Sequence, residues 1–150
     1  MAVAAIGIGS NLGDALGNVR KSFEALRKIG KLKSVSSCYR SKPWGGGAQA
    51  QNEFINAAAL VETTLRPHEL LAALQRIEVE LGRVPTYHWG PRIIDLDILY
   101  YDDVVVNEAA LKIPHPHLEQ RAFALVPLAE IDARYAAMAA AIDASDVLAL

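Results

Sequence analysis

The sequence predicts an α+β domain with a ferredoxin-like core, in which helices pack on a mainly antiparallel sheet. Segments with strand and helix periodicity follow one another in the order β-α-β-β-α-β. Strictly alternating βα units are absent, which disfavours a doubly wound sheet. The 150 residues are 52% hydrophobic and 21% charged, so we expect a single domain, 1–150, with one core.

The first two elements are expected to be a strand and an amphipathic helix. Residues 3–8 are apolar and predict a buried strand, and the turn that follows offers Asp14 as a helix cap. Residues 15–29 place apolar side chains three and four apart, which predicts a helix that Gly30 ends. The apolar positions of this helix are Leu16, Val19, Phe23, Leu26 and Ile29.

Two strands and a second helix are expected next. Residues 32–40 predict one strand, and a loop with three consecutive Gly separates it from a strand over residues 53–63. Pro67 fits the first turn of a helix that runs to about residue 81. The apolar face of this helix comprises Leu70, Leu74, Ile77 and Leu81.

A loop opens the last part of the chain. Residues 83–92 have no periodicity and hold two Pro, one Gly and two Arg. Residues 95–101 predict a strand, and residues 104–106 predict a short partner strand across a tight turn. Beyond a segment rich in Pro and His, we expect helical turns over residues 123–131 and 134–141.

The charge and cysteine content disfavour several classes of protein. The net charge is −2, from 15 basic and 17 acidic residues, so there is no basic excess to bind a nucleic acid. No apolar run reaches the roughly 18–20 residues that a membrane helix needs. Cys38 is the one cysteine, and we interpret it as a packed residue of a strand. We expect a cytoplasmic monomer that binds neither nucleic acid nor membrane.

Asp95 and Asp97 are candidate metal ligands. Side chains two apart on a strand point the same way, so the two carboxylates would project together while Leu96 enters the core. Two adjacent carboxylates repel each other, and Mg²⁺ would relieve that repulsion. The pair alone is a weak signal, because it also fits the polar face of an edge strand or pairing with arginine.

Arg83 and Arg92 bracket the loop that leads into this acidic strand. The arginine fork suits phosphate oxygens, and Mg²⁺ beside arginines is the arrangement that phosphoryl transfer uses. Two solvated arginines of a surface loop are the alternative. Trp89 and Pro91 favour the site, because a large apolar side chain in such a loop needs something to pack on.

Two further groups of residues could bind a ligand. His115 and Arg121 could both donate hydrogen bonds to phosphate, and a zinc site is disfavoured because no third ligand is well spaced. Phe54, Asn56 and Phe123 could form an aromatic slot in which an amide reads a flat heterocycle. From the sequence alone, the reading that the two Phe belong to the core is the stronger one.

A glycine-rich segment, residues 7–13, begins at the end of the first strand. Its third Gly is one residue too late for the dinucleotide-binding fingerprint, and no phosphate-binding P-loop motif occurs in the chain. The residues as a whole resemble the 6-hydroxymethyl-7,8-dihydropterin pyrophosphokinases, enzymes of folate biosynthesis. The resemblance rests on residues 7–13, 39–43, 54–58, 75–78, 82–83, 89–99, 114–116 and 121–123, of which 89–99 is the most specific stretch.

The resemblance implies a reaction and its metal site. ATP would give its β,γ-pyrophosphoryl group to the hydroxymethyl oxygen of the dihydropterin, and AMP would leave. Asp95 and Asp97 would hold two Mg²⁺ ions that bridge the ATP phosphates. Arg83 and Arg92 would steady the group in transfer. The family fold is α+β with a ferredoxin-like core, which agrees with the order of elements.

The resemblance also implies two sets of binding residues. Phe54 and Phe123 would sandwich the pterin, Asn56 would read its ring edge, and backbone groups of Ser41, Lys42 and Trp44 would help. ATP would be placed by Gln75, Trp89, Ile98, His115 and Arg121.

Two other functions stay open at this point. A metal-dependent nucleotide-sugar transferase could also use an Asp-x-Asp pair, although 150 residues are few for such an enzyme. A non-catalytic ferredoxin-like ligand-binding domain would have no use for paired Asp, two loop Arg and an aromatic slot together.

Overall fold

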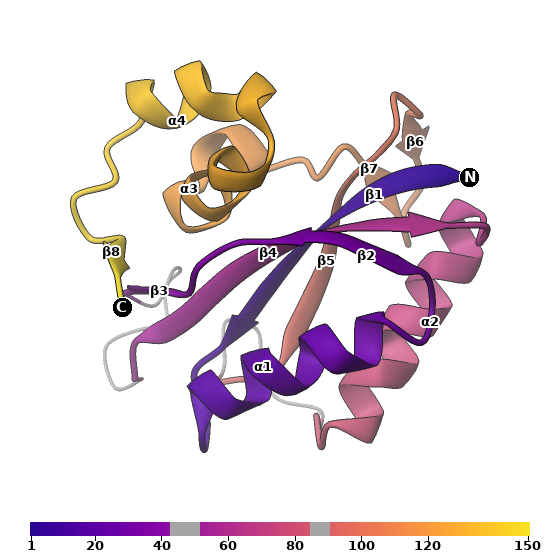
Figure 1. Ribbon diagram of the computed structural model, residues 1–150, viewed down its shortest axis with the longest axis horizontal. Helices are drawn as coiled ribbons and strands as arrows, with labels where there is room; N and C mark the ends of the chain where they lie inside the picture. Colours follow the sequence, from indigo (N-terminus) through magenta and orange to yellow (C-terminus); the bar gives the residue numbers. More distant parts are fainter. Residues whose placement is uncertain (43–51, 85–90) are drawn as a thin grey trace.

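The molecule is built on one antiparallel sheet with helices on both faces (Figure 1). In the computed structural model we describe residues 1–42, 52–84 and 91–150. The strands lie in the order β5-β1-β4-β3-β8, and β2 also pairs with β4. This confirms the predicted fold class. The strand bounds are β1 Ala2–Ser10, β2 Lys31–Val35, β3 Tyr39–Ser41, β4 Phe54–Thr63, β5 Asp95–Tyr101 and β8 Leu148–Ala149.

Two layers of helix bury the two faces of this sheet. Helices α1 (Ala15–Leu26) and α2 (Pro67–Glu80) cover one face, where their apolar residues meet those of β1, β4 and β5. Helices α3 (Ala122–Ile131) and α4 (Ala136–Ala141) cover the other. The predicted apolar face of α2 is confirmed for Leu70, Leu74 and Ile77, which are at most 4% exposed.

The start of α1 was predicted correctly, but its end was not. The Asp14 carboxylate accepts a hydrogen bond from the Gly17 backbone N–H at 3.1 Å, so Asp14 is the N-cap. The helix ends at Leu26, four residues before Gly30. Gly30 has a different role, because a Cβ there would lie 2.4 Å from the Glu62 carbonyl oxygen of β4. Its lack of a side chain allows two backbones to approach closely.

The strand predicted over residues 32–40 is in fact two strands, β2 and β3. Ser36 lies in the break between them, and its Oγ accepts a hydrogen bond from the Ala58 N–H at 2.8 Å. The Ser36 N–H in turn donates to the Ala58 carbonyl at 2.9 Å. The Ser36 hydroxyl thus replaces one backbone acceptor in the hydrogen-bond ladder with β4. Cys38 lies outside both strands and is half-buried against the core.

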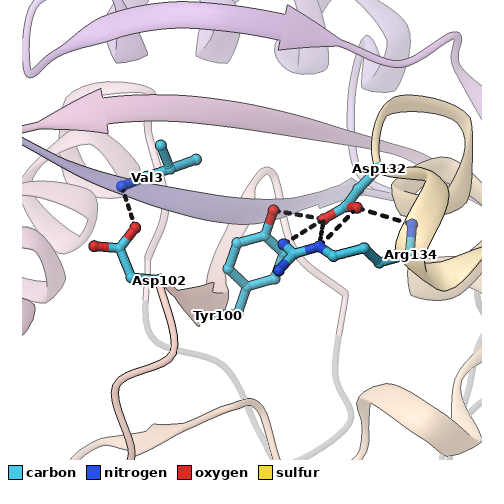
Figure 2. Close-up of polar contacts among 5 residues, drawn as sticks. All are labelled: Val3, Tyr100, Asp102, Asp132 and Arg134. Atoms are coloured by element: carbon cyan, nitrogen blue, oxygen red, sulfur yellow. Dashed lines mark hydrogen bonds and ion pairs between the residues drawn. The ribbon is translucent and has the colours of Figure 1, made fainter.

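The predicted partner of β5 was wrong. Strand β6 (Val106–Asn107) pairs with β7 (Lys112–Ile113), not with β5. Asp102, just after β5, adopts a left-handed φ of 47°, and its carboxylate accepts a hydrogen bond from the Val3 N–H at 2.8 Å (Figure 2). Asp102 therefore ties the end of β5 to β1 and directs the chain away from its own strand.

The C-terminal helical region was predicted correctly in outline. A 3₁₀ turn (Leu118–Gln120) precedes α3, and another (Ala133–Tyr135) joins α3 to α4. The Tyr100 hydroxyl of β5 donates to Asp132 Oδ2 at 2.7 Å, and Arg134 donates to the same carboxylate (Figure 2). This group fixes the end of α3 onto the sheet. Within the residues described, we find no helix with the length and apolarity to cross a membrane.

Candidate active site

A cavity of about 260 Å³ opens on the face of the sheet that α3 covers. It lies over the part of the sheet where β1 runs between β4 and β5, the first strand in the sheet order. Its lining combines acidic, basic and aromatic side chains from strands and loops far apart in the sequence. The lining residues are Gly7, Ile8, Gly9, Ser41, Lys42, Phe54, Asn56, Ala57, Arg92, Asp95, Asp97, Leu99, His115, Leu118, Arg121, Phe123 and Ala124.

Gly7 and Gly9 form the floor of this cavity. Gly9 is paired with Asn56 of β4 on one side and with Asp95 of β5 on the other. A Cβ at Gly7 would lie 3.1 Å from the Leu99 side chain, and one at Gly9 would lie 3.5 Å from Asn56 Oδ1. Side chains at either position would therefore project into the space that the glycines leave open.

Asp95 and Asp97 both line the cavity, as strand alternation predicts. The intervening Leu96 is 4% exposed and packs on the opposite face. Burial, reinforced by the negative charge of Asp95, raises the pKa of Asp97 to about 7, although Arg121 opposes this shift. A cation placed between the carboxylates would offset both the cost of burying Asp97 and its repulsion by Asp95.

Glu78 is a third carboxylate near the acidic strand, and no role was predicted for it. Its Oε2 accepts a hydrogen bond from the Leu96 N–H at 2.8 Å and lies 2.7 Å from Arg83 Nη1. The same Arg83 nitrogen lies 3.4 Å from Asp95 Oδ1. Burial raises the pKa of Glu78 in spite of these partners. The sequence held a signal for it, because Glu78 falls four residues after Leu74 on the buried face of α2.

Arg92 lines the cavity and is held by the turn that follows β1. The Arg92 N–H donates to Asn11 Oδ1 at 2.7 Å, and the Asn11 N–H donates to the Arg92 carbonyl at 3.0 Å. Asn11 is 2% exposed, and Asn18 Nδ2 supports its turn by donating to the Leu12 carbonyl at 3.0 Å. Asn11 is thus a positioning residue that turn propensity alone did not reveal.

His115 enters the cavity rim from the segment after β7. Its N–H donates to the Leu99 carbonyl at 2.9 Å, and its Nδ1 accepts from the His117 N–H at 3.2 Å. Burial, with the positive charge of Arg121, lowers the pKa of His115 to about 4. The ring is therefore neutral at pH 7, and the network assigns its proton to Nε2, which can donate to an anion.

Arg121 lies between the acidic and aromatic parts of the cavity. Its guanidinium carbon is 5.6 Å from the centroid of the Phe123 ring. Burial lowers the pKa of Arg121, and the charges of Asp97 and Asp95 oppose that shift. The Arg121 guanidinium therefore lies against the Phe123 ring and also interacts electrostatically with the Asp95 and Asp97 carboxylates.

Phe54 and Phe123 lie outside the buried core clusters, so the stronger interpretation from the sequence, that both Phe belong to the core, was wrong. Phe54 and Phe123 are partly exposed and line the cavity together with Asn56. Ser41 and Lys42 line it from the end of β3. Asn56 Nδ2 donates to Ser41 Oγ at 2.7 Å, and both residues are buried.

Three of the predicted site residues that the structure describes, Arg83, Gln75 and Ile98, are not among the lining residues. Gln75 is exposed on α2, and Ile98 is 5% exposed within the core on the other face of the sheet. Trp44 and Trp89 lie outside the described residues. Within the described part of the chain, no three His, Cys, Asp or Glu side chains gather as a metal site.

Comparison with known proteins identifies relatives over most of the chain. Residues 5–133 match the family model described as 7,8-dihydro-6-hydroxymethylpterin-pyrophosphokinase (HPPK). A 2-amino-4-hydroxy-6-hydroxymethyldihydropteridine pyrophosphokinase of Aquifex aeolicus is 42% identical over 132 residues, which cover 88% of this chain and 81% of the relative. An enzyme of the same name from Haemophilus influenzae is 42% identical over 133 residues, covering 87% and 82%.

Solved structures agree with the fold. A structure titled as HPPK-DHPS in complex with substrates aligns with a TM-score of 0.67 at 13% identity, covering 87% of this chain and 40% of that one. Plasmodium falciparum HPPK-DHPS aligns with a TM-score of 0.65 at 16% identity and similar coverage. At these identities the structural similarity shows only a shared fold. Membership of the family is shown by the family model and by the relatives that are 42% identical in sequence.

Proposed function

Because the chain belongs to the 7,8-dihydro-6-hydroxymethylpterin-pyrophosphokinase family, and is a pyrophosphokinase, we propose that the cavity over Gly7 and Gly9 is its active site. The reaction transfers pyrophosphate from ATP to the hydroxymethyl oxygen of 6-hydroxymethyl-7,8-dihydropterin in folate biosynthesis, and AMP leaves. One observation carries the proposal. A carboxylate pair and an aromatic slot flank the same glycine floor, so the ends of two substrates can meet above it.

The metal site of the proposal consists of Asp95 and Asp97. Mg²⁺ prefers one or two carboxylates, with waters and phosphate oxygens completing its shell. The donor set fits this preference, because two carboxylates face one cavity and the burial that raises the pKa of Asp97 favours a cation there. Two Mg²⁺ ions would neutralise the charge of the ATP phosphates and would orient the β-phosphorus.

The basic residues of the cavity would place the triphosphate. Arg92, Arg121 and the Nε2–H of neutral His115 supply hydrogen-bond donors around the acid pair. Arg83 Nη1 lies 3.4 Å from Asp95 Oδ1, so Arg83 can contribute a further guanidinium. Phosphoryl transfer depends on such positioning and charge neutralisation more than on covalent help from the protein. A part in ATP binding for Gln75, Trp89 and Ile98 stays a prediction.

The aromatic slot would hold the pterin. Phe54, Phe123 and Asn56 line the same cavity, so a flat heterocycle would stack between the two rings and the amide would bind its edge. Ser41 and Lys42 also line the cavity, and Ser41 pairs with Phe54 in the sheet, so their backbone groups would help to bind the ring. The hydroxymethyl oxygen would then point across the glycine floor toward the phosphates. A contribution from Trp44 stays a prediction.

A direct assay tests the function. Purified protein is mixed with ATP, Mg²⁺ and 6-hydroxymethyl-7,8-dihydropterin, and nucleotide products are separated by chromatography. We expect AMP in a one-to-one ratio with pterin pyrophosphate, and no AMP after chelation of Mg²⁺. Formation of ADP, or no turnover at all, would falsify the proposal and would revive the nucleotide-sugar transferase or binding-domain alternatives.

A separate titration tests the metal site without relying on turnover. Binding of a non-hydrolysable ATP analogue should depend on Mg²⁺ in the native protein and lose that dependence in Asp97→Asn. Asp103→Asn is the matched control, since Asp103 is exposed and is not among the residues lining the cavity. We also propose that the enzyme is a monomer, which size-exclusion chromatography would test. We propose further that it acts in the cytoplasm.

A further inference from the structure

A carboxylate outside the cavity binds β3 to α3. Glu130 lies in the last turn of α3 and is not among the residues that line the cavity. Its Oε2 accepts hydrogen bonds from the Ser37 N–H at 2.9 Å and from Ser37 Oγ at 3.1 Å. Its Oε1 accepts a hydrogen bond from the Tyr39 hydroxyl. One side chain of α3 therefore binds both the first residue of β3 and the segment just before that strand.

The chemistry of the partners fixes the direction of these hydrogen bonds. The Ser37 N–H can only donate, so it needs an acceptor. Although burial opposes it, the hydrogen bonds from Tyr39 and Ser37 lower the pKa of Glu130, so its carboxylate is ionised at pH 7 and can only accept. Burial and the hydrogen bond to Glu130 raise the pKa of Tyr39 to about 12, so the phenol keeps its proton and donates it. Both oxygens of Glu130 are thus used as acceptors.

Helix α3 is fixed on the sheet, whereas β3 is short. Leu125 and Leu128 of α3 are 0% exposed and pack in the core cluster on this face of the sheet. Strand β3 has three residues, which pair with β4 on one side and with the two-residue strand β8 on the other. So short a strand has few backbone hydrogen bonds of its own. Contacts from outside the sheet therefore contribute a large share of its local stability.

Strand β3 and helix α3 each supply part of the cavity wall. Ser41 ends β3 and is paired with Phe54 of β4, and both residues line the cavity. Phe123 lines it from the first turn of α3. Glu130 follows Phe123 by about two helical turns on the same helix. A contact that holds β3 to α3 therefore also constrains the separation of Ser41 from Phe123.

We propose that Glu130 is a positioning residue that holds β3 against α3 and thereby sets the separation of the cavity walls at the aromatic slot. The inference rests on the proposed function, because this slot is the one that would hold the pterin. It assigns to Glu130 an effect on the pterin and not on ATP. Asp95 and Asp97 lie on β5, which β1 and β4 separate from β3, so the metal and triphosphate end should be unaffected.

Two titrations on the same variants test the inference. Calorimetry measures the Kd of a non-hydrolysable ATP analogue with Mg²⁺, and then the Kd of 6-hydroxymethylpterin in the presence of that analogue. We expect Glu130→Ala to weaken pterin binding by about fivefold to tenfold, the cost of lost charged hydrogen bonds, and to leave the Kd of the ATP analogue within about twofold. A merely structural role would weaken the binding of both ligands alike.

Two further variants serve as rescue and control. Glu130→Gln keeps an acceptor oxygen for the Ser37 N–H, and its amide can donate to the two hydroxyls, so pterin binding should stay within about threefold of the native value. Glu80→Ala removes an exposed carboxylate from the last turn of α2 and should change neither Kd.

The two Kd values decide the inference. Equal losses of affinity for the two ligands in Glu130→Ala would overturn it, and so would an unchanged affinity for the pterin. If Glu130→Ala does not fold, Tyr39→Phe replaces it, because this change removes only the hydroxyl that Glu130 binds. Tyr39→Phe should lose about threefold in pterin affinity alone, and native affinity there would overturn the inference equally. A native protein that releases no AMP overturns the proposed function itself, and the AMP assay identifies that failure separately.

Discussion

Arg83 lies 2.7 Å from Glu78, and this pair joins the end of α2 to the acidic strand β5. The Glu78 carboxylate also accepts a hydrogen bond from the Leu96 N–H, between Asp95 and Asp97 in the sequence. A buried carboxylate thus supports both a candidate catalytic arginine and the backbone of the candidate metal ligands. This relationship, and the cavity beside it, lead to four predictions.

Glu78→Ala should lower the free energy of unfolding by about 2–3 kcal/mol, because it leaves the buried Leu96 N–H and the Arg83 guanidinium without their acceptor. Glu78→Gln keeps an acceptor and should cost about 1 kcal/mol. Urea denaturation measures both. Glu80→Ala, an exposed neighbour on α2, should change stability by less than about 0.5 kcal/mol. Equal effects at positions 78 and 80 would contradict this prediction.

Asp97→Ala should abolish turnover while leaving the thermal midpoint unchanged or raised. Without metal, the native state keeps a buried carboxylate beside Asp95, and its removal relieves repulsion and desolvation. Calorimetry without Mg²⁺ at pH 8, where Asp97 is mostly ionised, measures the midpoint, and AMP release measures turnover. A folded variant with near-native turnover would exclude Asp97 from the metal site.

Arg92→Ala should lower kcat by about 10²–10³, the usual cost of losing one donor to a developing charge. The fold should be spared, because the contacts of Arg92 with Asn11 use its backbone N–H and carbonyl. Steady-state AMP release is compared with that of Arg27→Ala, whose guanidinium is exposed on the far layer of the molecule. An Arg92→Ala enzyme that differs from the native one only in KM would place this arginine in ground-state binding.

His115 should make the native protein sensitive to mild acid. Its pKa is about 4 in the folded protein and about 6.5 in the unfolded chain, so between these values the unfolded state binds the extra proton. The stability contribution of the neutral ring is complete above pH 6.5 and is lost as the pH falls toward 4. Relative to His115→Gln, the native protein should lose about 1–2 kcal/mol between pH 7 and pH 4, after allowance for solvent screening. Urea denaturation at each pH measures the free energy of unfolding. An equal change of that free energy with pH in the two proteins would refute the prediction.

The sequence predicted those features of the fold that follow from a repeating pattern. Alternation placed Asp95 and Asp97 on one face and Leu96 on the other, and it placed Phe54 beside Asn56. The same alternation places Ile98 on the face of Leu96, and Ile98 lies in the core.

Single polar contacts over long sequence distances could not be predicted in this way. The Ser36 hydroxyl accepts a hydrogen bond that a backbone carbonyl would accept in a regular strand ladder. The spacing of apolar residues does not indicate such a contact. Asp102 binds Val3, 99 residues away, and so ends β5 in a manner that the local turn did not indicate. Asn11 and Glu78 act on residues 81 and 18 positions distant. Each effect depends on which backbone group the tertiary fold brings to that side chain.

The pairing of Gly9 with both Asn56 and Asp95 has a consequence for how this enzyme can change. Asn56 and Asp95 stand two strand spacings apart, about 9–10 Å, and the backbone hydrogen bonds of β1 with β4 and β5 set that span. A point substitution can alter what either half-site recognises, but it cannot move one half-site relative to the other. Only an inserted residue that shifts the register of β1 could do so, and it would turn Gly7 and Gly9 to the opposite face. New substrate preferences are therefore expected to arise through the side chains at the two ends of the cavity, with the transfer distance inherited unchanged.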